Sequence, residues 1–229
     1  MTDEGTSPTE TWVEDKGQEY PYAYDKGGKL KRWFGVKGIP AAILIDPTGA
    51  IVWRGHPGSL KKQTIKENLE GAVLSPIYDW PGKAKSAKRA LKSGNFSKAL
   101  SAAEKLGEDG AGVAASLRQM IDGRLKRIER LNAAGDYLQL EEFGESTEKA
   151  FAGLPEGDKV SAILDELAAN KEAQQIIKAQ QSVCKLISGK IKKAKKAKLE
   201  DKLRDIAREY PDTAAARDAE AAIVKLRTG

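Results

Sequence analysis

Cys184 and His56 are the only cysteine and the only histidine in the 229-residue chain. Dithiol chemistry needs two thiols, one of them activated as a thiolate, and a structural zinc site needs several cysteines or histidines at short spacing. The residues therefore predict neither an intramolecular dithiol centre nor a Cys/His metal site. We expect no catalytic residue, no metal and no cofactor in this chain.

The surroundings of both residues indicate structural roles. Cys184 lies in "IIKAQQSVCKLI", whose apolar residues at 176, 177, 183, 186 and 187 predict the core face of a helix. A buried free cysteine behaves as a small hydrophobe, so a redox role for Cys184 is disfavoured. His56, in "RGHPG", stands between a predicted strand and a turn, and a lone histidine is a poor candidate for catalysis.

Charge divides the chain into two parts. Residues 1–80 carry 10 Lys/Arg and 11 Asp/Glu, whereas residues 81–229 carry 29 and 22. Seven lysines and no acid stand in residues 185–198. This run contains no arginine and no aromatic residue for base stacking, so a solvated helix face is favoured over a nucleic-acid site. No apolar run reaches the roughly 18 residues of a membrane span.

Glycine, proline and apolar patterning predict a mixed α/β region over the first 75 residues. The expected elements begin with a helix from Thr6 to near Gly17, a strand at 20–25 and a short helix from about residue 29. A strand at 41–46, buried on both faces, should then pair through a turn at 46–49 with an antiparallel strand at 50–55. A helix at 59–73, with Ser59 as its N-cap, should end the region.

The segment "DKGGKLKRWFGVKGIPAAILIDPTGAIVWRGHPGSL" identifies the family of this region. Val36 and Gly38-Ile39-Pro40, followed by an apolar strand and "DPTG", resemble the second half of a TlpA/ResA-type thioredoxin-like domain across residues 3–73. The resemblance implies a cis peptide bond before Pro40. It also implies a substrate-docking loop formed by Gly38, Ile39 and Pro40, in which the backbone of Ile39 is left free to pair with an extended peptide.

The same resemblance implies that the Cys-x-x-Cys half of the domain stands before Met1. Two explanations stay open: the chain is a fragment or early-truncated form, or it descends from a protein that lost its redox centre. Residues 1–5 are acidic and polar and do not form a signal peptide. A cell-envelope location in a bacterium follows from the resemblance only if the N-terminus is truncated.

Alanine-rich helices follow a predicted linker at residues 77–83. "GNFSKAL" at 94–100 resembles the turn of a tetratricopeptide-type helical hairpin, and "GDY" at 135–137 resembles the turn of a second such hairpin. "YPDTAAARDA" at 210–219 resembles the junction of a third. Long amphipathic helices are expected at 111–131 and 159–187. Together these features predict a helical bundle or short solenoid over residues 84–229.

The sequence supports two functions of different classes. One is a thioredoxin-like protein whose partial domain, residues 1–76, docks substrates without redox activity. The other is a non-enzymatic interaction module that acts through the tetratricopeptide-like helices. Both predict proteins or peptides as partners, with no partner, oligomeric state or subcellular location identified.

Overall fold

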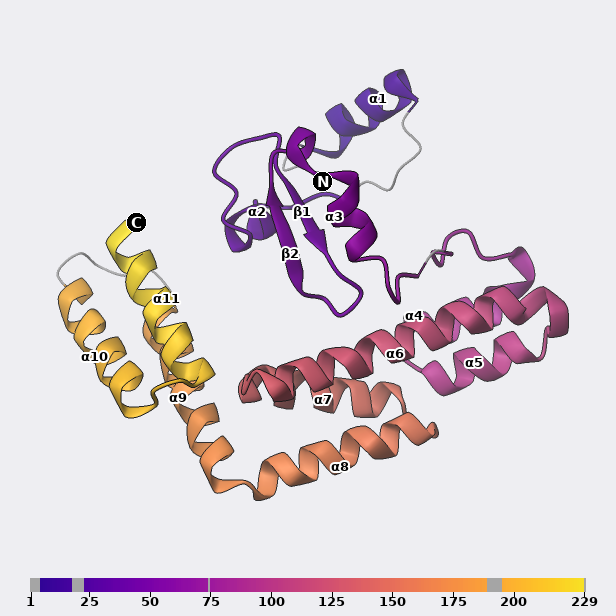
Figure 1. The fold of residues 1–229 in the computed structure, drawn as a ribbon. Coiled ribbons are helices and arrows are strands. Elements are labelled where there is room, and N and C mark those ends of the chain that lie inside the picture. The colour runs from indigo at the N-terminus through magenta and orange to yellow at the C-terminus, as the bar shows by residue number, and fades with distance from the viewer. Residues whose placement is uncertain (1–4, 18–22, 74, 189–194, 229) are drawn as a thin grey trace. The chain divides into compact units, whose positions relative to one another are not determined.

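The computed structural model describes residues 5–17, 23–73, 75–188 and 195–228 and divides the chain into two units. The first unit comprises residues 1–46 and 51–68. The second comprises residues 47–50 and 69–229. Within the described ranges the chain is mainly helical, with eleven α-helices and one two-stranded antiparallel sheet (Figure 1).

The first unit combines short helices with a hairpin. Its elements are α1 (Thr6–Lys16), α2 (Lys29–Trp33), β1 (Ala42–Ile45), β2 (Ile51–Gly55), a 3₁₀ turn at Pro57–Ser59 and α3 (Lys62–Glu67). Gly17 ends α1 in the left-handed conformation, with φ of 59°, as expected for a glycine stop. The strands pair Ala42 with Gly55 and Leu44 with Trp53, and a register shift follows Leu44. The predicted antiparallel hairpin is therefore confirmed.

Three expectations for this unit are wrong. No strand forms at 23–25, where only Tyr24 makes an isolated bridge; residues 20–22 lie outside the described ranges. Ser59 does not cap α3, because the chain first forms the 3₁₀ turn and Lys61 occupies the N-cap position. β1 is not covered on both faces, since its side chains are half-buried and Ile45 is 49% exposed.

The second unit consists of helices arranged largely as successive antiparallel pairs. They are α4 (Lys85–Lys92), α5 (Phe96–Glu104), α6 (Ala111–Ala133), α7 (Tyr137–Ala150), α8 (Pro155–Ala169), α9 (Lys171–Ile187), α10 (Lys196–Glu209) and α11 (Ala214–Thr228), with 3₁₀ turns at Gly82–Ala84 and Gly107–Gly110. No helix in the described ranges is both long and apolar enough to cross a bilayer.

Helix boundaries in this unit follow local signals. Gly94 and Gly135 adopt φ of 79° and 63° at the two predicted hairpin turns, and the Asn95 side chain accepts a hydrogen bond from Lys98 N–H to cap α5. The predicted single helix at 159–187 is wrong. Asn170 breaks it, because its Oδ1 accepts bonds from Glu172 N–H and Ala173 N–H, each 3.1 Å long, and starts α9.

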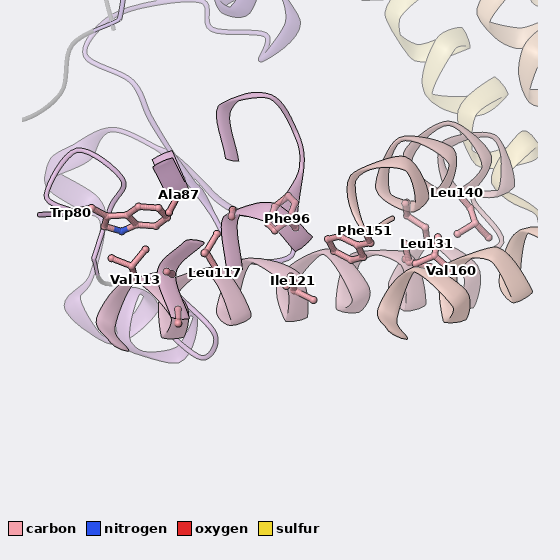
Figure 2. Close-up of a cluster of buried hydrophobic side chains, with 14 of the residues drawn as sticks. Trp80, Ala87, Phe96, Val113, Leu117, Ile121, Leu131, Leu140, Phe151 and Val160 are labelled. Atoms are coloured by element: carbon pink, nitrogen blue, oxygen red, sulfur yellow. The ribbon is translucent and has the colours of Figure 1, made fainter. Parts of the chain in front are cut away.

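The main core of the second unit lies along α6, which packs against α5, α7 and α8. Figure 2 shows Trp80, Ala87, Val113 and Leu117 at one end, Phe96, Ile121 and Phe151 in the middle, and Leu131, Leu140 and Val160 at the other end. The rings of Phe96 and Phe151 meet edge to face, with centroids 5.2 Å apart. Trp80, from the predicted linker, is 3% exposed and belongs to this core.

A second core joins the last three helices. Val183 of α9 and Leu203 of α10 are 1% and 0% exposed, and they pack with four residues of α11: Ala219, Ala222, Ile223 and Leu226. Fully burying one such aliphatic side chain contributes about 1.5–3 kcal/mol to folding. These contacts hold α9, α10 and α11 together as a three-helix group.

Candidate functional site

Asp25 holds the start of α2, the short helix that precedes the loop identified from the sequence as a docking site. Its carboxylate accepts hydrogen bonds from Leu30 N–H (2.9 Å) and Lys31 N–H (2.8 Å), so it holds the first turn of α2. The bond from Lys31, and then the bond from Leu30, lowers the pKa of Asp25. Sequence reasoning missed this role by placing Asp25 in a strand. An aspartate four residues before a helix, followed by Gly27-Gly28, was the available signal.

The chain leaves α2 through a tight turn and then exposes the predicted docking residues. Val36 N–H bonds to Lys31 O at 2.9 Å, and Gly35 has φ of 65°. The peptide bond between Ile39 and Pro40 is cis, as the resemblance implied. Ile39 is 84% exposed, and neither its N–H nor its C=O bonds to another described residue. Gly38, Ile39 and Pro40 thus form an exposed segment two residues before β1.

Aromatic and apolar side chains elsewhere in the first unit are also exposed. Trp33 is 72% exposed and touches Phe34 edge to face, with ring centroids 4.6 Å apart. Leu30, Val52 and Ile65 are each more than a third exposed. In the described part of the first unit, no apolar side chain is fully buried. The unit therefore offers apolar surface around a hairpin whose strands each have only one strand partner among the described residues.

His56 has a local structural role. Its Nδ1 accepts a hydrogen bond from Gly58 N–H at 3.1 Å, which caps the 3₁₀ turn at Pro57–Ser59. The carbonyl of His56 accepts a bond from Ser59 Oγ at 2.8 Å. These contacts agree with the structural interpretation of this histidine.

Cys184 is exposed on α9, which corrects the expectation that it is a buried core residue. Although the residue is exposed, neighbouring atoms partly desolvate the thiol and raise its pKa, and the negative charges of Asp218, Glu142 and Asp136 raise it further. A thiol with a raised pKa stays protonated near neutral pH, whereas disulfide exchange requires the thiolate. Among the described residues, no three Cys, His, Asp or Glu side chains gather as a metal site.

A buried amide network, which the sequence did not reveal, holds Cys184's helix in place. The side chain of Gln180 is buried, with 2% of the residue exposed. Its Nε2 donates hydrogen bonds to Asp136 Oδ1 (2.9 Å) and to Asp218 Oδ2 (3.2 Å). Its Oε1 accepts a hydrogen bond from Leu138 N–H (3.1 Å). The network joins α9 to α7 and α11. Both polar atoms of the buried amide have partners, so the network fixes the packing of these helices without leaving that amide unsatisfied.

Two hollows lie on the helical unit. One, of about 580 Å³, is bordered by the α6–α7 turn, the start of α9 and the loop before α11, with Tyr137, Ile176 and Arg217 in its lining. Arg217 donates to Ala134 O at 2.5 Å across it. The other, of about 490 Å³, lies between α9 and α10 and adjoins a hollow of about 280 Å³. Both are open surface grooves that suit a peptide better than a small enclosed ligand.

Comparison with known proteins yields no match to a protein-family model, to a curated protein or to a solved structure.

Proposed function

We propose that this chain is a redox-inactive, thioredoxin-like protein that docks extended peptides at Gly38, Ile39 and Pro40. The observation that carries the proposal is the exposed Ile39, three residues before β1, whose backbone N–H and C=O have no partner among the described residues. An extended peptide can pair with such groups as a strand adds to a sheet edge. The TlpA/ResA-type sequence pattern supports the same assignment.

The proposal of redox inactivity rests on the state of Cys184. It is the only thiol in the sequence, it belongs to the helical unit, and its raised pKa keeps it protonated. A single cysteine also needs a thiol from another molecule to resolve a mixed disulfide. Such a residue cannot replace a Cys-x-x-Cys pair in turnover.

Docking can be tested with S-carboxymethylated insulin B chain, an extended peptide without a reactive thiol. We expect this peptide to shift the amide NMR signals of Gly38 and Ile39. Ile39→Pro removes the N–H donor and should abolish binding, whereas Ile39→Ala keeps the donor and should retain it. Unchanged signals from β1 and β2 verify that both variants are folded. Equal binding by Ile39→Pro, or shifts confined to the helices, would contradict docking at this loop.

Redox inactivity is tested separately by insulin reduction with dithiothreitol. We expect the same rate of insulin precipitation with and without the protein. An acceleration that disappears in Cys184→Ser would show that this thiol turns over and would overturn the assignment.

A second candidate function is protein binding through the tetratricopeptide-like helices, without enzymatic activity. It is favoured by the paired helices α4–α5 and α6–α7, with glycine turns at Gly94 and Gly135, and by the open hollows on the same unit. Stacked helix pairs typically present such surfaces to peptides. Hydrogen exchange measured with and without a peptide probe tests it, because bound helices gain protection.

A further inference from the structure

A groove rimmed by lysines runs between α9 and α10 in the helical unit. Its two hollows share Lys202 in their linings, so they adjoin each other. Four lysines border it: Lys185, Lys195, Lys198 and Lys202. Three aliphatic residues form its floor: Leu186, Leu199 and Ile206. We call these seven residues the lysine groove.

The floor of the lysine groove is the outer layer of the second core. Leu186, Leu199 and Ile206 pack against the buried cluster that contains Val183 and Leu203, yet each remains partly open to solvent. An aliphatic strip of this kind gains free energy when a ligand covers it, in proportion to the apolar area removed from water. The floor alone therefore favours a ligand with an apolar face.

The rim carries positive charge that the protein itself does not neutralise. All four lysines are exposed, and none forms an ion pair with a carboxylate among the described residues. Two nearby acids already have arginine partners. Glu200 pairs with Arg204 and Arg227, and Asp205, the one acid among the described lining residues, lies 3.6 Å from Arg208. The groove is thus an electropositive channel that suits carboxylates from a partner.

The spacing of the rim favours a helical ligand. Lys195, Lys198 and Lys202 follow one another at intervals of three and four residues, so they lie on one side of α10. Carboxylates three and four residues apart on another helix have similar spacing, about 5–6 Å between neighbours. Leucines on the adjacent face of that helix would reach the groove floor, as in other helix-in-groove complexes.

We propose that the lysine groove binds an acidic amphipathic helix of a partner protein. This inference rests on the second proposed function and specifies its partner class. A nucleic acid fits the groove less well, because the groove lining contains no aromatic residue for stacking and no arginine, and the aliphatic floor has no counterpart on a phosphate backbone. An anionic membrane fits less well too, since a bilayer takes up projecting apolar side chains rather than a recessed floor.

The test uses the full chain and a fluorescent peptide of about 18 residues, made of leucine and glutamate with leucines on one helical face. A scrambled peptide of identical composition controls for charge alone. Fluorescence anisotropy should show saturable binding of the first peptide and at least about tenfold weaker binding of the scrambled one. Binding should weaken as salt is raised, because exposed charges are screened.

Paired charge reversals locate the site. Lys198→Glu/Lys202→Glu changes the groove rim, and Lys171→Glu/Lys178→Glu changes two exposed lysines on α9 outside the groove by the same net charge. We expect about tenfold or greater loss of affinity in the first variant and less than about twofold in the second. Circular dichroism verifies that both variants retain their helices.

Several results would overturn the proposal. Equal weakening by both variants, equal affinity for the scrambled peptide, or no binding of either peptide would each exclude the groove as the site. Tighter binding of oligothymidylate or of phosphatidylserine vesicles, lost in Lys198→Glu/Lys202→Glu, would reassign it to those ligands. Hydrogen-exchange protection by the peptide on other helices would remove the groove but leave the second proposed function standing, so the two fail separately.

Discussion

Leu117, Leu140 and Leu203 of the helical unit are completely removed from solvent, whereas Trp33, Ile39 and Ile45 of the first unit keep 72%, 84% and 49% of their surface exposed. Both units contain apolar residues, but only in the helical unit are these residues packed into continuous cores. Burial of apolar surface is the main stabilising contribution to a fold, and small units have the least of it. The helices therefore hold most of the stability, and the first unit keeps apolar surface exposed to solvent.

The largest expected difference between the units comes from truncating one large side chain in each. Leu117→Ala should destabilise the helical unit by about 2–5 kcal/mol, because it leaves a cavity in the core along α6. Trp33→Ala should change stability by no more than about 0.5 kcal/mol, since most of that side chain is already in water. Urea unfolding followed by far-UV circular dichroism measures both. Equal costs would mean that Trp33 is buried in solution.

A pair of glycines extends the comparison to the backbone. A Cβ added at Gly110 would lie 1.9 Å from the carbonyl oxygen of Ala103, whereas one added at Gly38 would meet no atom within 4 Å. Gly110→Ala should therefore cost about 1–3 kcal/mol through forced movement at the start of α6. Gly38→Ala should leave the unfolding midpoint nearly unchanged. A large loss in Gly38→Ala would indicate close packing that the open loop does not have.

Capping residues should give an intermediate effect. Asn170→Ala removes the acceptor for two N–H groups of α9 and should cost about 0.5–2 kcal/mol. Ser59→Ala serves as the control, because Ser59 bonds only to the carbonyl of His56 within the 3₁₀ turn and caps no α-helix. Chemical unfolding of both variants measures the difference. If Ser59→Ala is the costlier change, the first unit is more cooperative than its exposed residues imply.

The smallest expected effect concerns the pH dependence of the helical unit. Burial raises the pKa of Asp218 above its ordinary value of 3.8, while the bond from Gln180 opposes this and Asp136 adds to it. The pKa of Asp218 is higher in the folded than in the unfolded chain, so ionisation of this carboxyl lowers the free energy of unfolding. As the pH falls through the folded-state pKa, Asp218 becomes protonated and this cost to stability is removed. Asp218→Asn keeps an acceptor for Gln180 but carries no charge.

Thermal unfolding of Asp218→Asn should show a slightly higher midpoint than wild type at neutral pH. The advantage should shrink as the pH falls through the folded-state pKa of Asp218, because the wild-type carboxyl then also loses its charge. Glu220→Gln, on the same helix, removes the same charge without touching Gln180 and serves as the matched control. A lower midpoint for Asp218→Asn at neutral pH would contradict the raised pKa.

The sequence predicted best what short-range signals determine. The glycines at 94 and 135 and the turn sequence at 46–49 between two apolar segments act through the local backbone, so the helical hairpin turns and the β-hairpin were predictable. The predictions for Ser59 and Asp25 failed because a competing local contact, the 3₁₀ turn and the start of α2 respectively, determines the role of each residue. The prediction for Cys184 failed because the sequence does not show which side of α9 faces a neighbouring helix. Likewise, the lysine run was visible in the sequence, but the groove it borders exists only because α10 packs beside α9.

The single-residue joint at Asn170 fixes more than a helix boundary. Its N–H still bonds to Glu166 O in the last turn of α8, while its side chain starts α9, so one residue sets the rotational phase between two helices. Each residue of an α-helix advances the side chain by about 100° around the axis. One residue inserted or deleted at this joint would turn Ile176 and Gln180 away from their partners. Relatives of this protein should therefore keep the chain length at Asn170 unchanged.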